Sequence, residues 1–182
     1  MTAPKLALAA FAAVAVSSTS AHARPRPAGM GGSAFEANKT FGLGVEGPQP
    51  FGLVGKWFFT PNEALDFGLG DDFVLGSRAG FHAYGDLLFH PFSLASAPAF
   101  ELPFYVGVGG RIWTFTDSGR VAPNDATAFG FRIPLGVSFD FNNIPLDTFV
   151  QVVPTIDFFS GHPAHSVFVD FDVSVGVRYW FN

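Results

Sequence analysis

Ten ionisable residues fall at alternate positions in segments that are otherwise apolar or rich in small residues. Successive side chains of a strand point to opposite faces, so residues two apart share a face. Within its segment each of these residues lies on the parity opposite to the mainly apolar positions. The charged set is Glu46, Lys56, Asp66, Asp86, Arg111, Arg132, Asp157, Asp170, Asp172 and Arg178. Six carboxylates and four basic groups on one face could form ion pairs or an ion or proton path.

A second group that could do chemistry is the sequence His162-Pro163-Ala164-His165-Ser166. Two histidines could clamp a metal, and a histidine beside a serine could serve a hydrolase, with Asp170 assisting. However, a catalytic triad is defined by geometry, and the Pro and Ala at the centre are typical of a turn. His82 and His90 are eight residues apart on one strand face, too far apart to bind one metal. We therefore expect no catalytic, metal-binding or cofactor-binding residue.

The composition limits the class of protein. Charged residues make up 14% of the 182 residues and aromatic residues 16%, with 24 Phe and 21 Gly, whereas soluble domains are about 25% charged. Disordered chains have the opposite bias. The net charge is −5, without a basic patch or a phosphate-binding loop, which excludes a nucleic-acid partner. No Cys occurs, so thiol catalysis, disulfides and Cys-based zinc sites are excluded.

The first residues have the features of an export signal. Lys5 precedes eleven apolar residues, Leu6 to Val16, and Ala21-His22-Ala23 fits a cleavage site. Eleven residues are too few to cross a bilayer, which takes about 20. The sequence predicts a cleaved secretory signal peptide over residues 1–23, with a short buried helix or an anchor as the alternative. Residues 24–39, rich in Pro, Gly and Ala, predict a flexible leader.

Eight alternating segments follow, separated by Pro, Gly, Asn and Asp clusters. They are 40–46, 51–60, 63–70, 78–90, 101–116, 127–140, 147–159 and 166–181. No long apolar run suited to a membrane-spanning helix occurs after residue 39. In the last segment, the odd positions from Val167 to Phe181 are all apolar or aromatic. The fifteen residues from Val167 to Phe181 exceed the usual five or six of soluble strands and suit a strand tilted across a membrane.

The charged face indicates where these strands lie. It combines Gly, some aromatic residues and isolated charges of both signs, which suits the narrow interior of an eight-stranded barrel. The apolar face, rich in Phe, Val and Leu, would then contact lipid, where only a closed barrel satisfies the backbone of strands. We predict an all-β fold, an eight-stranded antiparallel up-and-down transmembrane β-barrel over residues 40–182. The ten charged residues are expected to form a structural salt-bridge network that fills the interior, with an ion or proton path as the alternative.

Connections and prolines add further expectations. Thr60–Asn62 and Asn142–Pro145 predict tight turns, which face the periplasm in this class of barrel, and the loops at 71–77, 117–126 and 160–165 would face outward. Residues 91–100 predict a long apolar connection lying as a flap at the membrane interface. Pro134 and Pro154 lie inside predicted strands. Because proline removes a ladder donor, β-bulges are expected at both.

Several motifs together carry a resemblance to a known group of proteins. They are Phe41-Gly42-Leu43-Gly44, Asp66-Phe67-Gly68-Leu69-Gly70, Gly109-Gly110-Arg111, Arg132-Ile133-Pro134-Leu135-Gly136-Val137, Pro145-Leu146-Asp147-x-Phe149 with Pro154 and Asp157, and Gly176-Val177-Arg178-Tyr179. The chain resembles the small porin-like outer-membrane β-barrels of Gram-negative bacteria, and within them an uncharacterised eight-strand group. The resemblance covers about residues 40–181 and implies a β-barrel without established catalysis. The terminal strand is similar to the assembly signal of such barrels, apart from Asn182 after Phe181, which implies the barrel-assembly machinery as a partner.

These observations predict a monomeric, non-enzymatic barrel of the cell outer membrane, with outer-membrane lipid as a partner and the loops as an interaction surface. One alternative is a soluble periplasmic barrel that binds lipid inside, with its apolar face turned inward. A second is a lipid-modifying outer-membrane enzyme that uses the loop at His162–Ser166. The parity also predicts that Val173→Arg blocks assembly far more than Ser174→Arg, since charge on the lipid face costs about 2–4 kcal/mol at the midplane.

Overall fold

A computed structural model describes residues 34–71, 80–116, 125–160 and 167–181. The strands within them are β1 (Phe41–Pro48), β2 (Phe51–Phe58), β3 (Glu63–Asp71), β4 (Phe81–Ser96), β5 (Phe100–Thr116), β6 (Asp125–Arg132), β7 (Leu135–Phe141), β8 (Leu146–Ser160) and β9 (Val167–Trp180). No helix in these ranges is long and apolar enough to cross a membrane. The predicted signal peptide and the residues 162–166 lie outside the described residues.

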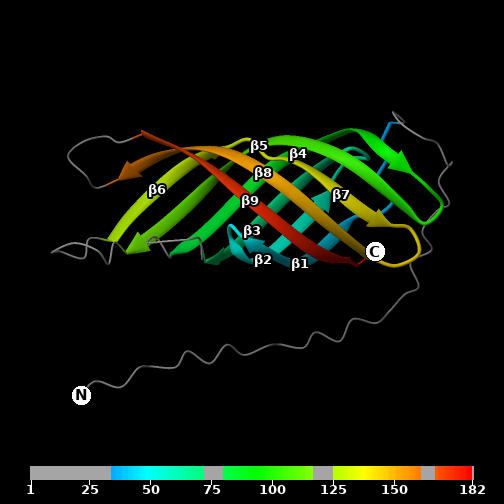
Figure 1. Cartoon of the computed structure of the whole chain (residues 1–182), viewed down its shortest axis with the longest axis horizontal. Coiled ribbons are helices and arrows are strands. Elements are labelled where there is room, and N and C mark those ends of the chain that lie inside the picture. The colour runs from blue at the N-terminus through cyan, green and yellow to red at the C-terminus, as the bar shows by residue number, and fades with distance from the viewer. Residues whose placement is uncertain (1–33, 72–79, 117–124, 161–166, 182) are drawn as a thin grey trace, which may run out of the picture.

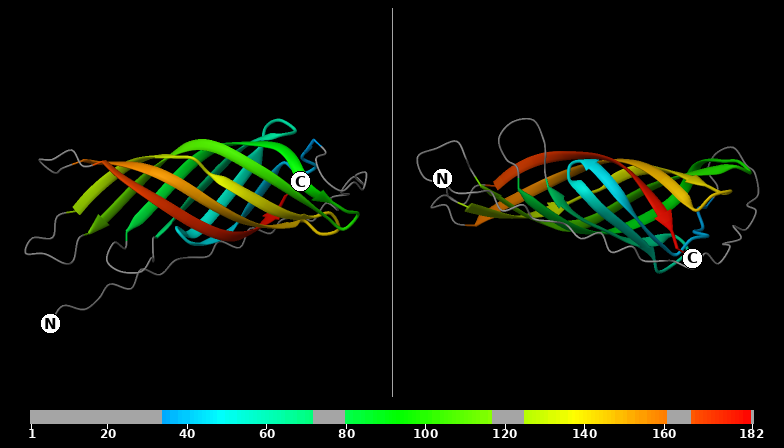
Figure 2. Two further views of the ribbon diagram at one scale, coloured as in Figure 1. Left: turned by 45° about the horizontal axis from the view of Figure 1, so that its top comes forward. Right: turned by 90° about the horizontal axis from the view of Figure 1, so that it is seen from below.

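The strands form one closed antiparallel sheet. Strands that follow one another in sequence are paired, except β6 and β7, and β1 also pairs with β9, with Gly42 opposite Trp180 and Pro48 opposite Ser174. β6 and β7 continue one another, because both pair with β5 on one side and β8 on the other. The predicted up-and-down β-barrel is thereby confirmed. The strands run obliquely around its axis in all three views (Figure 1, Figure 2).

The predicted bulges at Pro134 and Pro154 are wrong. The register of β5 runs unshifted past the first proline, from Gly109 opposite Arg132 to Val106 opposite Leu135, and that of β8 with β9 runs unshifted past Pro154. Each proline loses only the bond that its own nitrogen would donate. The carbonyl of Pro134 still accepts from the Gly107 amide at 2.9 Å, and that of Pro154 from the Ile133 amide at 3.0 Å. One lost ladder bond per proline is tolerated without an inserted residue.

The register shifts occur instead between β4 and β5, between Phe89 and Phe92 and again between Ser93 and Ala95. Pro91 lies in the first of these bulges. The bulges let β4 continue to Ser96, so the connection to β5 is only 97–99, closed by a bond from the Ala97 amide to the Phe100 carbonyl of 2.8 Å. The predicted apolar flap over 91–100 is therefore wrong, because most of that segment is strand.

The barrel has two distinct ends. At one, the short turns 59–62, 97–99 and 142–145 connect successive strands, and we call it the turn end. At the other, β3, β5 and β8 finish at Asp71, Thr116 and Ser160, and we call it the loop end. Both predicted tight turns, Thr60–Asn62 and Asn142–Pro145, lie at the turn end. The C-terminal end of β9 reaches the same end (Figure 1).

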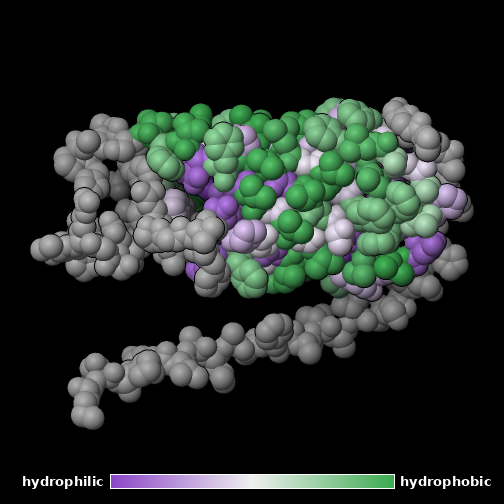
Figure 3. Space-filling view, viewed as in Figure 1, coloured by the Kyte–Doolittle hydropathy of each residue, from purple (hydrophilic) through white to green (hydrophobic). Residues whose placement is uncertain are grey.

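The parity deduced from the sequence describes both faces of the wall. The side chains with apolar parity point outward and are exposed along every strand, as Leu53, Val108 and Val175 illustrate. Figure 3 shows this outer face covered largely by apolar side chains. The opposite parity is buried and carries the charges. The alternative of a soluble barrel with its apolar face turned inward is therefore wrong.

Inward glycines make room for the large inward side chains of adjacent strands. Tyr105 is opposite Gly136, and a β-carbon on that glycine would lie 2.4 Å from the tyrosine ring. Phe149 is opposite Gly176, where the same distance is again 2.4 Å. At these two levels the large side chain of one strand occupies the space beside the glycine of its partner strand. Gly136 and Gly176 are thus required by the packing of the interior.

Candidate functional site in the barrel interior

The ten charged residues singled out from the sequence all lie on the inward face. Nine of them are buried, and the side chain of Asp170, toward the loop end of β9, is 32% exposed. Their positions follow from the period of two along each strand, which alternates them with the outward apolar residues. The pairing of strands then decides which of them meet.

Toward the loop end, two arginines hold a group of aspartates. Arg111 on β5 pairs with Asp157 on β8 through two hydrogen bonds and with Asp172 on β9 at 2.6 Å. The same guanidinium lies 3.6 Å from Asp170. Because a guanidinium and a carboxylate match in shape, such two-point contacts fix orientation as well as charge. The cluster ties three strands together across the interior.

Arg132 extends this cluster toward the middle of the barrel. Its guanidinium lies 3.3 Å from the Asp172 carboxylate and 3.2 Å from both oxygens of Asp86. It also stacks over the Tyr84 ring at 4.1 Å, and the Tyr84 hydroxyl donates to Glu46 Oε1 at 2.6 Å. Arg132 is fully buried, so its charge is stabilised by these partners rather than by water.

Toward the turn end, Arg178 on β9 is the centre of a second cluster. Its Nη1 lies 2.8 Å from Asp66 on β3, and its Nε and Nη2 donate to the two oxygens of Asp147 on β8 at 3.1 and 3.0 Å. Its guanidinium also lies 4.2 Å from the centre of the Phe149 ring. Two carboxylates thus depend on one arginine that is almost completely buried.

Lys56 and His90 form a contact that the sequence does not predict. The lysine ammonium lies 2.8 Å from His90 Nε2 and 4.5 Å from the centre of the Tyr105 ring. Tyr105 donates onward to Gln151, whose amide donates to Ser174 at 2.9 Å. The two inward histidines, His82 and His90, are fully buried on β4, in separate surroundings. Polar side chains from β2, β4, β5, β8 and β9 are thereby linked across the interior.

Residues 34–40, which we call the N-terminal strap, pack into the turn end of the barrel. Phe35 is buried against Phe58 and His90, with ring centres 5.7 and 5.2 Å apart. Lys39 forms an ion pair with Asp140 and donates to the Phe141 carbonyl at 2.8 Å. The expectation of a flexible leader up to residue 39 is therefore wrong for residues 34–39. A single buried aromatic and a buried lysine fix this segment in place.

Replacing Lys39 with Ala should release the strap. The variant removes the ion pair between Lys39 and Asp140, and hydrogen bonds to charged groups contribute about 1.5–3 kcal/mol. We expect that loss in the free energy of unfolding, together with faster hydrogen exchange of the Ala37 amide, which donates to the Pro61 carbonyl at 2.6 Å. Amides of β8 should keep their protection. Unchanged exchange at Ala37 would show that Phe35 alone holds the strap.

Sequence reasoning missed four charged members of the interior. Glu101, Asp140 and Asp147 are end residues of the predicted segments 101–116, 127–140 and 147–159 and have inward parity, so applying the period of two up to the segment ends would have identified them. Lys39 lies outside the strands, where no period applies, and only the folded strap reveals it. Trp113 and Trp180 are buried inside, whereas Trp57 and Tyr179 are exposed outside.

The chemistry of the interior is that of paired charges. Among the described residues, no group of three or more His, Asp or Glu is arranged to hold a metal ion. In the cluster toward the loop end and in the cluster toward the turn end, an arginine lies between aspartates. These aspartate carboxylates are therefore already paired with a guanidinium. The histidine and serine proposed for a metal clamp or a hydrolase, His162, His165 and Ser166, lie outside the described residues. The structural role of the ten-residue network stays a prediction.

Comparisons with known proteins give one structural match. No protein-family model and no curated protein sequence matches the chain. The chain is similar to the crystal structure of the N-terminal β-barrel domain of Pseudomonas aeruginosa OprF, at 18% sequence identity and a TM-score of 0.48, with 78% of this chain and 94% of that chain covered. Similarity at this level does not transfer the function of that protein to this one.

Proposed function

We propose that the chain is an outer-membrane β-barrel with a structural or interaction role, an interior filled by side chains, and no catalytic activity. The observation that carries this proposal is the inverted distribution of side chains: the outer face is apolar along the middle of every strand, and the ion-paired charges are inside. Soluble proteins rarely expose contiguous apolar patches beyond a few hundred Å2. An apolar band around a closed barrel is the surface that lipid requires.

The outer aromatic residues support a membrane interface at the turn end. Near that end, Trp57 packs against Phe59 with ring centres 6.2 Å apart, and Tyr179 against Phe181 at 5.0 Å. On β7, Phe139 packs against Phe141 with ring centres 4.8 Å apart. Transmembrane barrels carry girdles of aromatic residues where the apolar band meets water. We propose that these rings lie at the level of the lipid head groups.

The contacts across the interior support a barrel that does not conduct. Arg178 on β9 reaches Asp66 on β3, and Arg111 on β5 reaches Asp172 on β9, although neither pair of strands is adjacent. Eight strands enclose an interior that side chains just fill. An ion path would have to break these pairs, so we favour a structural network over the alternative of a proton or ion path.

The terminal strand and the loops are the parts of the barrel that would contact other proteins. We propose that the protein is a monomer whose terminal strand, β9, is read by the barrel-assembly machinery, with Phe181 at its end. The loops at the loop end would face the cell exterior as an interaction surface. A lipid-modifying enzyme remains the second candidate function, resting on the sequence of His162, His165 and Ser166 alone.

Fractionation of cells tests the membrane placement. We expect the full chain in the outer-membrane fraction, resistant to extraction by carbonate, with a folded band that changes its electrophoretic migration only after heating. A closed barrel whose backbone bonds are all internal should resist detergent until it is heated. Release by salt or carbonate would contradict the proposal. Two proteins from the same cells serve as controls: a soluble periplasmic protein for the extracted fraction and a known membrane barrel for the outer-membrane fraction.

A further inference from the structure

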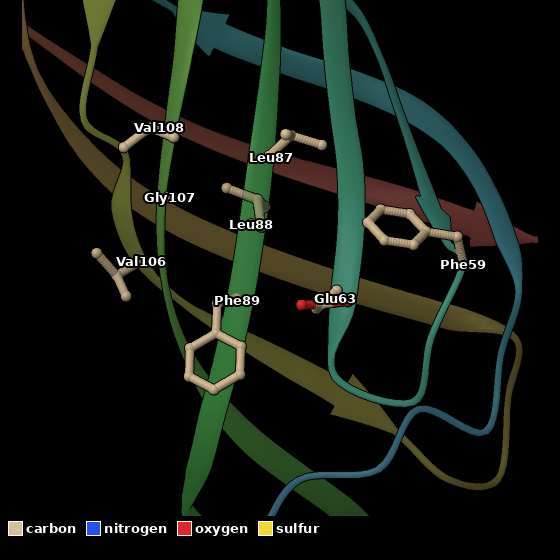
Figure 4. A pocket seen from close by; sticks show the side chains of 8 residues that line it. All are labelled: Phe59, Glu63, Leu87, Leu88, Phe89, Val106, Gly107 and Val108. Carbon is tan, nitrogen blue, oxygen red and sulfur yellow. The ribbon is translucent and has the colours of Figure 1, made fainter.

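A groove with a volume of about 540 Å3 lies on the outer face of the barrel, over β3, β4 and β5 near the turn end (Figure 4). Its apolar lining includes Phe59, Leu87, Phe89, Val106 and Val108. Figure 4 shows Phe59 on one side and the β4 and β5 side chains on the other, with Glu63 between them. This volume falls within the range of about 300–1,000 Å3 that small-molecule sites occupy.

Glu63 is the acidic residue of this lining. It is exposed at the first position of β3, opposite Phe89 of β4, and its parity is outward. Its Oε2 accepts a hydrogen bond from the Thr60 hydroxyl at 3.2 Å, which holds the carboxylate at the turn end of the groove. The groove therefore has a charged end beside the turn and an apolar body that extends toward the middle of the barrel wall.

The charges of the outer face select the ligand. All five basic residues in the described ranges, Lys39, Lys56, Arg111, Arg132 and Arg178, are buried inside the barrel. The described outer face thus offers carboxylates at its rims and no basic side chain for a phosphate-only head group. A primary ammonium can both balance the charge of Glu63 and donate N–H bonds to its carboxylate. A trimethylammonium group can balance the charge but has no N–H to donate.

From this complementarity, we propose that the groove binds a bilayer phospholipid whose head group bears a primary ammonium, with an acyl chain along Leu87, Phe89 and Val108 and the ammonium on Glu63. The site rests on the proposed membrane placement, because its apolar body needs a lipid environment. The ammonium would lie at the level of the turn 59–62, and the acyl chain would run toward the barrel middle.

The test uses the full chain reconstituted in bilayer discs containing equal amounts of phosphatidylethanolamine, phosphatidylcholine and phosphatidylglycerol. Lipids retained by the protein are counted by native mass spectrometry after the bilayer is removed. We expect the ethanolamine lipid to be retained roughly two- to five-fold over the choline lipid, the range that one partly exposed ion pair supports. Glu63→Gln should abolish this preference.

Asp71→Asn is the matched control, because Asp71 is an exposed carboxylate at the other end of the same strand. It should leave the preference unchanged. Equal retention of the ethanolamine and choline lipids, or an unchanged preference in Glu63→Gln, would overturn the site while the barrel still inserts. If the chain fails to float with vesicles and retains no lipid at all, the membrane placement and the site are both overturned.

Discussion

Arg178→Met is expected to lower the free energy of unfolding by about 3–5 kcal/mol, the cost of leaving buried charge without its partner. Arg178 is the shared partner of Asp66 and Asp147, and all three side chains are at most 3% exposed. Methionine keeps much of the volume and the contact with Phe149, so the loss reports on charge rather than on a cavity. The measurement is a guanidinium titration in detergent micelles, followed by the heat-sensitive band on gels.

A compensated variant separates the ion pairs from a general packing defect. Arg178→Met combined with Asp66→Asn and Asp147→Asn removes both buried negative charges along with the positive one. Replacing a whole buried ion network is often close to neutral, so most of the lost stability should return. If the triple variant is as unstable as Arg178→Met alone, the loss arises from packing, and the turn-end cluster has no electrostatic role in stability.

Val173→Arg should prevent assembly or destabilise the inserted barrel by about 2–4 kcal/mol, because it places a charge on the lipid face near the midplane. Val173 lies in the middle of β9, points outward and is 42% exposed. The measurement is the fraction of folded, protease-resistant barrel in lipid vesicles, compared with the unmodified chain. Full assembly of Val173→Arg would contradict the lipid-facing parity.

The best control for this variant differs from the one that the sequence suggests. Ser174 is fully buried and accepts a hydrogen bond from Gln151 at 2.9 Å. An arginine at this position would overfill the interior, so Ser174→Arg should itself be strongly destabilising. Val167→Arg is better matched, since Val167 lies on the same strand and face but at the loop end. Near the interface the cost falls to about 0–1 kcal/mol, so this variant should assemble.

Much of the fold follows from local pattern. The eight predicted segments correspond to the observed strands, and the inward placement of all ten charged residues follows from their parity. The expectations about strands and connections that failed involve prolines. Pro91 lies in a bulge within a strand that was predicted to end before it, and Pro134 and Pro154 lie in unshifted ladders. The sequence shows that a proline has no N–H to donate. It does not show whether the proline carbonyl still accepts a hydrogen bond from the partner strand.

The sequence alone determined which face of the wall each strand residue occupies, because side-chain direction alternates with the backbone of each strand and needs no partner. Only the tertiary structure decided which charges meet. Asp66 and Arg178 are 112 positions apart and come together through the closure of β1 on β9 and the tilt of the strands. The position of the N-terminal strap also depends on the tertiary structure. Lys39 pairs with Asp140 because the closed barrel places the turn end of β7 beside the strap. Register and closure are properties of the whole sheet, so no single segment encodes them.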